Sequence, residues 1–253
     1  MSERVIQVTS LGKRIKGKTI LEDISFEINQ GDCVALIGPN GAGKTVLMSC
    51  ILGDKKPSNG QVLIDGKAGK AKNKIAVLLQ ENTIPNSLKV EELIAFFQSI
   101  SDNPLTNQEV QDLLQFKKDQ YQQFADKLSG GQRRLLAFVL CLIDKPKILF
   151  LDEPTAGMDT STRQRFWEIV NDLKRAGTTI LYSSHYIEEV EHTADRILVL
   201  HQGKLIRDTT PYAMRHEEKE KQVTLPSSFV NIVHGLEDIY EVTEKRDVIS
   251  FMT

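Results

Sequence analysis

The sequence predicts an α/β fold in which a mostly parallel core sheet is accompanied by an antiparallel β region near the N-terminus and interrupted by a helical subdomain. Three observations predict it: strand patterns alternate with helical patterns, a glycine-rich loop joins an early apolar strand to a helix, and the pattern turns helical between residues 85 and 127. With 253 residues, of which 40% are hydrophobic, the chain suffices for one large domain with a modest appendage.

The first half of the chain is predicted to be rich in strands. Residues 24–28 alternate apolar and polar side chains, the period of a half-buried strand, and the apolar run 33–37 leads into the glycine-rich loop. A helix is expected from Lys44 to Leu52. A hairpin around Asp65-Gly66 and an apolar strand at 75–79 follow.

The second half begins with the helical stretch, where Leu93, Ile94 and Phe97 have the spacing of one helix face. The elements expected after it are a helix at 132–143, a buried strand at 148–151, an amphipathic helix ending at Gly177, and strands at 178–184 and 195–200. Because parallel strands end at the same edge of a sheet, ligands are expected at their carboxyl ends.

Composition excludes several classes of protein. Lys+Arg of 32 against Asp+Glu of 34 gives a net charge of -2, so we expect no nucleic-acid partner. The longest apolar run, residues 135–143, is far shorter than the roughly 20 residues that span a bilayer, and the first residues lack the apolar stretch of a secretory signal. Cys33, Cys50 and Cys141 have no C-x-x-C spacing, so we expect small buried hydrophobes rather than disulfides or a zinc site.

The strongest motif fits the pattern G-x-x-x-x-G-K-[ST] and lies between a predicted strand and a predicted helix. Its residues are Gly38, Pro39, Asn40, Gly41, Ala42, Gly43, Lys44 and Thr45. Val46, the next residue, is also expected to contact the nucleotide. Glycines let backbone N–H groups turn toward a phosphate, Lys44 supplies a positive charge to the β- and γ-phosphates, and Thr45 offers a hydroxyl to Mg²⁺. The alternative is a glycine-rich connector at the start of a helix.

Two carboxylates end the apolar strand at 148–151. Asp152 is expected to hold Mg²⁺, directly or through water, and Glu153 to act as the general base that orients and deprotonates an attacking water. Alternatively, both residues merely begin a turn before Pro154.

A third motif, Leu128-Ser129-Gly130-Gly131-Gln132, precedes the helix at 132–143. Ser129 and Gln132 form a capping box that could exist only to start the helix. The cap does not explain both glycines, which cost stability in a helix relative to alanine. Gly130 and Gly131 therefore favour a second site where an anion approaches the backbone.

In this order, the phosphate loop, LSGGQ, the strand ILFLDEP and a histidine after a later strand resemble the nucleotide-binding subunits of ABC transporters. The resemblance covers about residues 4 to 207, and LSGGQ is its most specific motif. It implies an ABC cassette of the P-loop NTPase fold, with an N-terminal antiparallel β subdomain and an inserted helical subdomain at about 85–140. We expect a nucleotide-binding domain at 1–209 and a short extension of unknown role at 210–253.

The resemblance also implies roles for single residues. In this family two cassettes dimerise head to tail, so Ser129 and Gly131 would touch the γ-phosphate of ATP bound to the other copy. Gln80 matches a glutamine that approaches Mg²⁺ and the attacking water, although a polar strand end is common. His185 matches a histidine that contacts the γ-phosphate, and Asp159 matches a loop that crosses the dimer interface or is simply a helix N-cap.

One position departs from the family pattern, which places an aromatic residue on an early strand to stack on adenine. Ile15 occupies that place by spacing, with Arg14 beside it. An aliphatic side chain offers dispersion without ring stacking, so we expect weaker adenine binding and looser discrimination against GTP.

The function expected from the resemblance is ATP hydrolysis that drives transport through a separate integral membrane permease, with ATP and Mg²⁺ bound between two copies or paralogous cassettes. The protein is expected to lie on the cytoplasmic face of the cell membrane. The lack of a large regulatory domain after the cassette favours export. The alternative is a soluble ABC ATPase that acts as an assembly factor.

Overall fold

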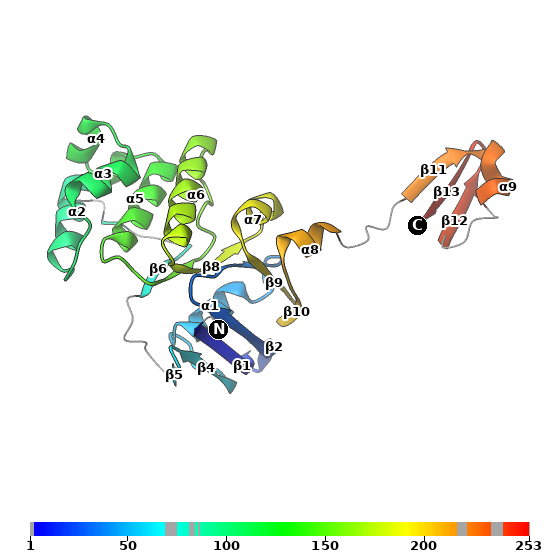
Figure 1. Cartoon of the computed structure of the whole chain (residues 1–253), viewed down its shortest axis with the longest axis horizontal. Coiled ribbons are helices and arrows are strands. Elements are labelled where there is room, and N and C mark those ends of the chain that lie inside the picture. Colours follow the sequence, from blue (N-terminus) through cyan, green and yellow to red (C-terminus); the bar gives the residue numbers. More distant parts are fainter. Residues whose placement is uncertain are drawn as a thin grey trace. The chain divides into compact units, whose positions relative to one another are not determined.

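The computed structural model describes residues 3–68, 75–80, 84–85, 87–216, 222–233 and 240–252. The chain divides into two compact units, Met1–Pro211 and Tyr212–Thr253, each of which is described by itself (Figure 1).

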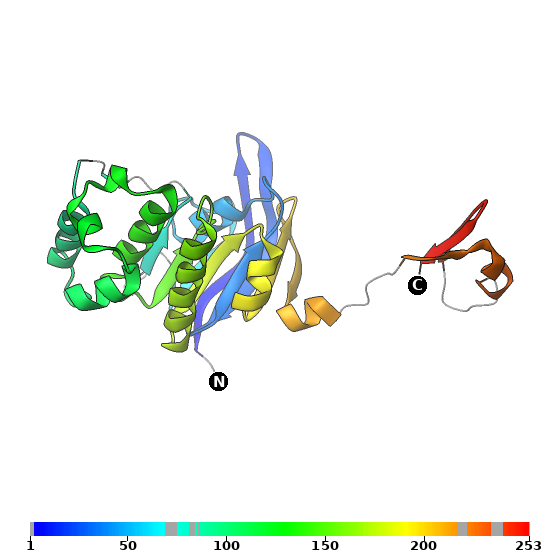
Figure 2. The same cartoon turned by 90° about the horizontal axis from the view of Figure 1, so that it is seen from above.

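The first unit is built on a six-stranded sheet with the strand order β10-β9-β3-β8-β7-β6 (Figure 2). Its strands are β3 (Cys33–Ile37), β6 (Ile75–Leu78), β7 (Ile148–Leu151), β8 (Thr179–Ser184), β9 (Arg196–His201) and β10 (Lys204–Thr209). Neighbouring strands are parallel except β9 and β10, which are antiparallel. The mostly parallel α/β sheet predicted from the sequence is therefore confirmed.

The central strands are continuous apolar runs because both faces of the sheet are covered. All residues of β3, β7 and β8 are buried, as expected for a parallel sheet between layers of helices. In the register, Leu78 pairs with Leu151, Leu151 with Tyr182, and Ile37 with Ser184. The loops that follow β3, β6, β7 and β8 therefore leave the sheet at the same edge.

A separate antiparallel sheet with the order β2-β1-β4-β5 packs its apolar side chains into a shared core with the main sheet. Its strands are β1 (Arg4–Ile15), β2 (Lys18–Asn29), β4 (Asn59–Ile64) and β5 (Lys67–Ala68). The alternation at residues 24–28 is confirmed, since Ile24, Phe26 and Ile28 are buried. Asp65 and Gly66 both have positive φ, 50° and 70°, as a tight two-residue hairpin turn requires.

The helices of the first unit cover the helical regions predicted from the sequence, and one further helix, which was not predicted, lies between β8 and β9. They are α1 (Lys44–Ile51), α2 (Val90–Ser99), α3 (Asn107–Leu114), α4 (Lys118–Gln122), α5 (Gly130–Leu142), α6 (Thr160–Arg175) and α7 (Ile187–Thr193), with a 3₁₀ turn at Ala125–Lys127. On α2, Leu93 and Ile94 are buried and Phe97 is half-buried. The fifth helix begins at Gly130 rather than at Gln132, because Ser129 caps it.

A chain of aromatic rings joins two of these helices to the sheet. Phe138 of α5 lies 4.3 Å from Phe166 of α6, which lies 5.1 Å from Trp167, and Trp167 lies 5.1 Å from Tyr182 of β8, all between ring centroids. These rings are buried and tilted or edge-on, the favoured geometry of aromatic pairs. They fix the helices α5 and α6 against the sheet.

The second unit is a small antiparallel sheet with the order β11-β13-β12. The helix α8 (Pro211–His216) has its first residue in the first unit and the others in the second. The remaining elements of the second unit are β11 (Gln222–Pro226), a 3₁₀ turn at Ser227–Phe229, α9 (Val230–Val233), β12 (Tyr240–Lys245) and β13 (Val248–Met252). Val233 and Ile249 form its core, with Val223, Leu225 and Val230 packed against them. The charged stretch at 214–222 falls partly outside the described residues.

Replacing Phe138 by alanine should destabilise the first unit by about 3–5 kcal/mol, because it removes a fully buried ring and leaves a cavity. Denaturant unfolding followed by Trp167 fluorescence measures the loss. Phe96→Ala is the control, since that side chain is 54% exposed and its removal should cost far less. Equal stabilities of the two variants would contradict the assignment of Phe138 to the core.

Candidate nucleotide site

The loop between β3 and α1 is shaped so that two of its positions exclude a side chain. A Cβ on Gly38, whose φ is 157°, would lie 2.1 Å from the carbonyl oxygen of Leu200. A Cβ on Gly43, whose φ is 109°, would lie 2.8 Å from a methyl group of Leu21. The loop leads directly into the N-terminus of α1, where backbone N–H groups lack partners within the helix and favour an anion.

Lys44 begins α1 and its side chain folds back over the loop. The Nζ atom donates to the carbonyl oxygen of Gly38 at 2.7 Å and lies 3.4 Å from that of Pro39 and 3.7 Å from Oε1 of Glu153. The side chain is only 7% exposed. The ammonium group is therefore held at the mouth of the loop, where a phosphate would enter.

Asp152 carries a carboxylate that is 3% exposed. Thr45 donates its hydroxyl to Oδ2 at 2.9 Å, and Ser183 donates its hydroxyl to Oδ1 at 2.6 Å. A buried carboxylate that accepts hydrogen bonds from two neutral hydroxyl groups retains the capacity to bind a cation.

Glu153 has a left-handed backbone with a φ of 46°, a conformation that costs a non-glycine residue roughly 1–3 kcal/mol. Its backbone N–H donates to Oγ of Ser183 at 2.9 Å. Its carboxylate is 10% exposed, and Oε2 lies 2.5 Å from Nδ1 of His185, whose side chain is 43% exposed. The strained backbone directs the carboxylate toward Lys44 and His185.

Lys44, Thr45 and Glu153 line one cavity of about 350 Å³, whereas Gly38, Asp152 and His185 are not among its lining residues. Its lining consists of Ile20, Asn40, Gly41, Ala42, Gly43, Lys44, Thr45, Val46, Gln80 and Glu153. The phosphate loop, the end of β6 and the end of β7 thus contribute to the same space. The aliphatic residues of the lining are Ile20, Ala42 and Val46, whereas Ile15 is not among them and lies at the tip of the β1–β2 hairpin. The assignment of adenine to Ile15 stays a prediction.

The LSGGQ residues lie together, but away from this cavity. Ser129 accepts from the backbone N–H of Gln132, and Gln132 Oε1 accepts from the N–H of Ser129, both at 3.2 Å, so the capping box is present. Gly130 is exposed. A Cβ on Gly131 would lie 3.1 Å from Oδ2 of Asp159, which brings the glycines beside the loop before α6.

Asp159 caps α6 and accepts from Ser161 Oγ at 2.6 Å, from Thr162 N at 3.0 Å and from Thr162 Oγ1 at 2.7 Å. These hydrogen bonds, that from Ser161 first, hold the pKa of the Asp159 carboxyl well below its usual range. The helix-cap role of Asp159 is therefore present, and its role at a dimer interface stays a prediction.

Two residues that hold the site were not predicted from the sequence. Ser183 bonds both Asp152 and Glu153, and Arg134 donates to backbone carbonyls on both sides of the cavity. For Ser183 a signal existed, because it is a hydroxyl residue near the carboxyl end of a predicted buried strand, two residues before His185. Arg134 follows LSGGQ in a helix, and nothing local distinguishes it from Arg133.

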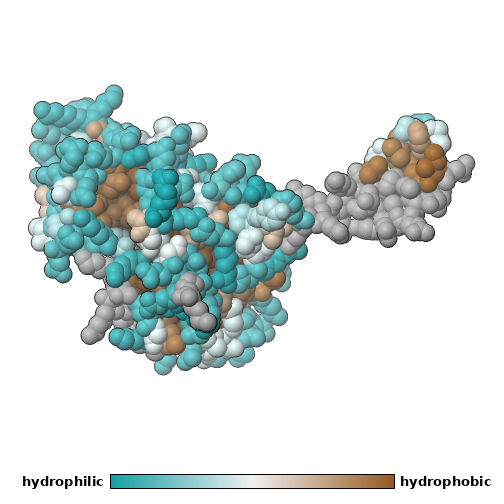
Figure 3. Space-filling view, viewed as in Figure 1, coloured by the Kyte–Doolittle hydropathy of each residue, from teal (hydrophilic) through white to brown (hydrophobic). Residues whose placement is uncertain are grey.

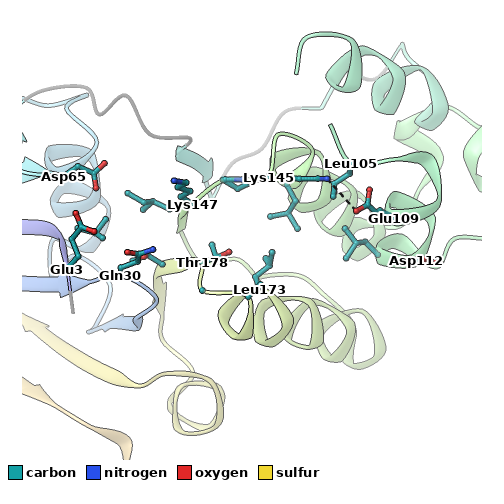
Figure 4. A pocket seen from close by; sticks show the side chains of 18 residues that line it. Glu3, Gln30, Asp65, Leu105, Glu109, Asp112, Lys145, Lys147, Leu173 and Thr178 are labelled. Atoms are coloured by element: carbon teal, nitrogen blue, oxygen red, sulfur yellow. Dashed lines mark ion pairs between the residues drawn. The ribbon is translucent and has the colours of Figure 1, made fainter. Parts of the chain in front are cut away.

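A larger cavity, of about 790 Å³, lies where β7 and β8 begin, at the opposite edge of the sheet (Figure 4). Its lining includes Ile148 and Thr179, the first residues of those strands, and the ion pair between Glu109 and Lys145 at 3.8 Å. None of the predicted site residues lines it. Its size therefore does not make it the nucleotide site, which requires a phosphate loop at a helix N-terminus.

The donors near the smaller cavity fit Mg²⁺ bound to a nucleotide. Mg²⁺ usually keeps several waters and takes only one or two protein ligands besides phosphate oxygens. Thr45 Oγ1 and Asp152 Oδ2, 2.9 Å apart, supply one hydroxyl and one carboxylate for that purpose. The fold and the site together define the P-loop class of α/β proteins.

Comparison with known proteins defines the family. The family model described as ABC transporter matches residues 21–156. The chain is 33% identical over 227 residues to "Nod factor export ATP-binding protein I" of Burkholderia orbicola (strain AU 1054), covering 86% of this chain and 75% of that protein. The chain therefore belongs to the ABC transporter family, as one of its ATP-binding subunits, and the cassettes of this family are ATPases.

Other relatives agree with this assignment. "Probable multidrug ABC transporter ATP-binding protein YbhF" of Escherichia coli (strain K12) is 29% identical over 244 residues, which cover 92% of this chain and 42% of that protein. A solved ATP-binding subunit of an ABC transporter matches with a TM-score of 0.73 and 26% identity, covering 83% of this chain and 92% of that one. A dimeric cassette bound to ADP and phosphate shares the fold, with a TM-score of 0.71 and 20% identity over 81% of this chain and 98% of that one.

Ser183→Ala should lower the turnover of ATP about tenfold while leaving nucleotide affinity nearly unchanged. The change removes the hydrogen bonds to Asp152 and to the strained backbone of Glu153, but it leaves the phosphate loop intact. Steady-state ATPase assays and titration with a fluorescent nucleotide check both quantities.

The matched control is Ser184→Ala on the same strand, whose hydroxyl accepts from the N–H of Tyr186 at 3.0 Å. It should keep turnover within about twofold. Equal turnover of wild type and Ser183→Ala would show that Ser183 does not support the site.

Proposed function

We propose that this chain hydrolyses ATP to energise export through a separate membrane-spanning partner. The observation that carries the proposal is the convergence of Lys44, Gln80 and Glu153 on one cavity. One relative is named for export and another for multidrug transport, which supports export rather than import as the direction of transport. The assembly-factor alternative is not supported by these relatives.

The phosphate loop and Lys44 would bind the β- and γ-phosphates of ATP. The Lys44 ammonium lies beside the loop carbonyls and needs little movement to contact a phosphate oxygen. The N-terminus of α1 adds a favourable dipole. Thr45 and Asp152 would hold Mg²⁺, which when bound neutralises charge on the phosphates.

Glu153 is proposed as the general base. Its carboxylate lines the cavity and would accept the proton of a water that attacks the γ-phosphorus, while the bond to the leaving ADP oxygen breaks. His185 lies 2.5 Å from that carboxylate and would orient it or contact the γ-phosphate. Gln80, on the other wall of the cavity, would position the water and approach the metal.

The second half of each site is proposed to come from another cassette. Ser129, Gly130 and Gly131 lie at the start of α5, outside the cavity of their own chain; the first two are exposed, whereas Gly131 is buried. A head-to-tail pair of copies, or of this chain and a paralogous cassette, would bring them to the γ-phosphate of the other copy. One similar cassette was solved as a dimer, which supports this arrangement.

The membrane partner is proposed to contact the helical subdomain at the cytoplasmic face. None of the helices within the described part of the chain is long and apolar enough to cross a membrane. Large apolar side chains are nevertheless exposed on and beside that subdomain, among them Phe96, Ile100 and Phe124. Figure 3 shows brown side chains gathered among its helices on an otherwise mainly hydrophilic face.

Glu153→Gln should keep ATP binding but reduce turnover by about 100-fold or more, because the amide cannot accept the proton of the attacking water. The variant should form an ATP-dependent dimer, since bound ATP is no longer consumed. Equilibrium binding, ATPase assays and size-exclusion chromatography with Mg-ATP measure the three properties. Normal turnover would remove Glu153 as the base.

Gly130→Ala tests whether that glycine serves a phosphate or only starts a helix. A Cβ there meets nothing within 4 Å, and alanine favours a helix over glycine by up to about 1 kcal/mol, so the isolated chain should be equally or more stable. In the Glu153→Gln background the ATP-dependent dimer should weaken about tenfold, which corresponds to about 1.4 kcal/mol. An unchanged dimer would favour the helix-start role.

A further inference from the structure

Arg134 is the most extensively hydrogen-bonded buried cation of the described first unit. It lies in the second turn of α5, the helix that begins after Ser129, and it is 8% exposed. Its guanidinium donates to backbone carbonyls through Nε, Nη1 and Nη2.

The accepting carbonyls belong to two separate segments of the site. After β7, Arg134 donates to Asp152 O at 3.0 Å, to Pro154 O at 3.1 Å and, more weakly, to Glu153 O at 3.4 Å. After β6, it donates to Gln80 O at 3.0 Å and to Leu79 O. One side chain therefore links the segment of the proposed base to the segment of the proposed water-positioning glutamine.

The chemistry suits arginine and not lysine. Burial lowers the pKa of Arg134, and the nearby negative charge of Asp152 opposes that effect. A guanidinium stays charged in proteins and presents five N–H donors in a rigid plane. An ammonium group is a compact point charge that would contact one segment and leave carbonyls of the other without a donor.

We propose that Arg134 is a positioning residue that couples the LSGGQ motif to the catalytic groups of its own chain. The inference rests on the proposed function, in which Ser129 contacts ATP held by another copy. Arg134 follows Ser129 by five residues, about 7.5 Å along a rigid helix, so a displacement of the helix start also moves the guanidinium. The guanidinium carries that movement to Gln80 and Glu153 together.

The strained backbone of Glu153 makes this coupling effective. Its φ of 46° is held by the Ser183 hydroxyl on its N–H side and by the Arg134 bonds to the carbonyls of Asp152, Glu153 and Pro154. Such a conformation persists only where the surroundings fix it. A shift of Arg134 therefore changes the direction of the Glu153 carboxylate, whereas the phosphate loop, built on β3 and α1, is not touched by it.

The test is Arg134→Lys in the full chain, assayed with Mg-ATP. We expect kcat to fall about 10- to 100-fold, as when a reacting group is misplaced by about 1 Å, with the affinity for Mg-ATP within about twofold of wild type. Thermal unfolding should show a folded protein. Arg134→Gln should have similarly low turnover, since a glutamine amide is also unable to donate to the segments of Gln80 and Glu153 together.

The matched control is Arg165→Lys. Arg165 of α6 also donates to backbone carbonyls, those of Leu113 at 3.1 Å and Asp112 at 2.6 Å, but these lie at the end of α3 and not in the segments of Gln80 and Glu153. It should keep kcat within about twofold. A folded Arg134→Lys protein with wild-type kcat, beside a Glu153→Gln protein without turnover, would overturn the coupling and leave the proposed function in place. Absence of ATPase activity in the wild type would overturn both.

If Arg134→Lys does not fold, hydrogen–deuterium exchange of the Glu153→Gln chain tests the coupling with Arg134 intact. Addition of Mg-ATP should slow hydrogen exchange in residues 129–134 and in residues 152–156. Both effects should appear together, at the same concentrations of nucleotide and of protein. Protection of 129–134 that depends on protein concentration, without any change in 152–156, would contradict the inference.

Discussion

The register of the parallel strands determines where every reactive side chain of this protein lies. Because β3, β6, β7 and β8 run in the same direction and are paired without bulges, their carboxyl ends meet at one edge. A slip of one residue in β7 would turn Asp152 away from Thr45 and place an apolar side chain there. The buried apolar core and the aromatic contacts of α5 and α6 therefore act on the site by fixing this register.

At that edge, neutral hydroxyl and carbonyl groups form hydrogen bonds with the buried charged side chains and hold the strained backbone of Glu153. The buried Asp152 carboxylate is satisfied by hydroxyls, and the buried Arg134 guanidinium by backbone carbonyls. Such pairings keep both charges without joining them in a direct ion pair, so the carboxylate stays available to a cation. The left-handed Glu153 lies between them, where its neighbours over-determine its conformation.

Local patterns allowed much of the fold to be predicted. The strand at 148–151 was predicted with the bounds that the structure shows, because a continuous apolar run between polar residues has few alternatives. The strand β10 was not predicted, since most of its side chains are exposed and its apolar pattern is weak.

The site was predictable only where its chemistry is local in sequence. The phosphate loop and the Asp152-Glu153 pair are short motifs. In contrast, Ser183 reaches Asp152 across 31 positions and Arg134 reaches Leu79 across 55. Such contacts depend on strand order, which the sequence does not show.

The proposed transport function is tested most directly by purification of the tagged protein from its native membranes in detergent, with mass spectrometry of the copurifying proteins and an ATPase assay of the complex. We expect an integral membrane protein with several spanning helices that raises ATP turnover. Copurification of soluble partners alone would contradict the proposed transport function.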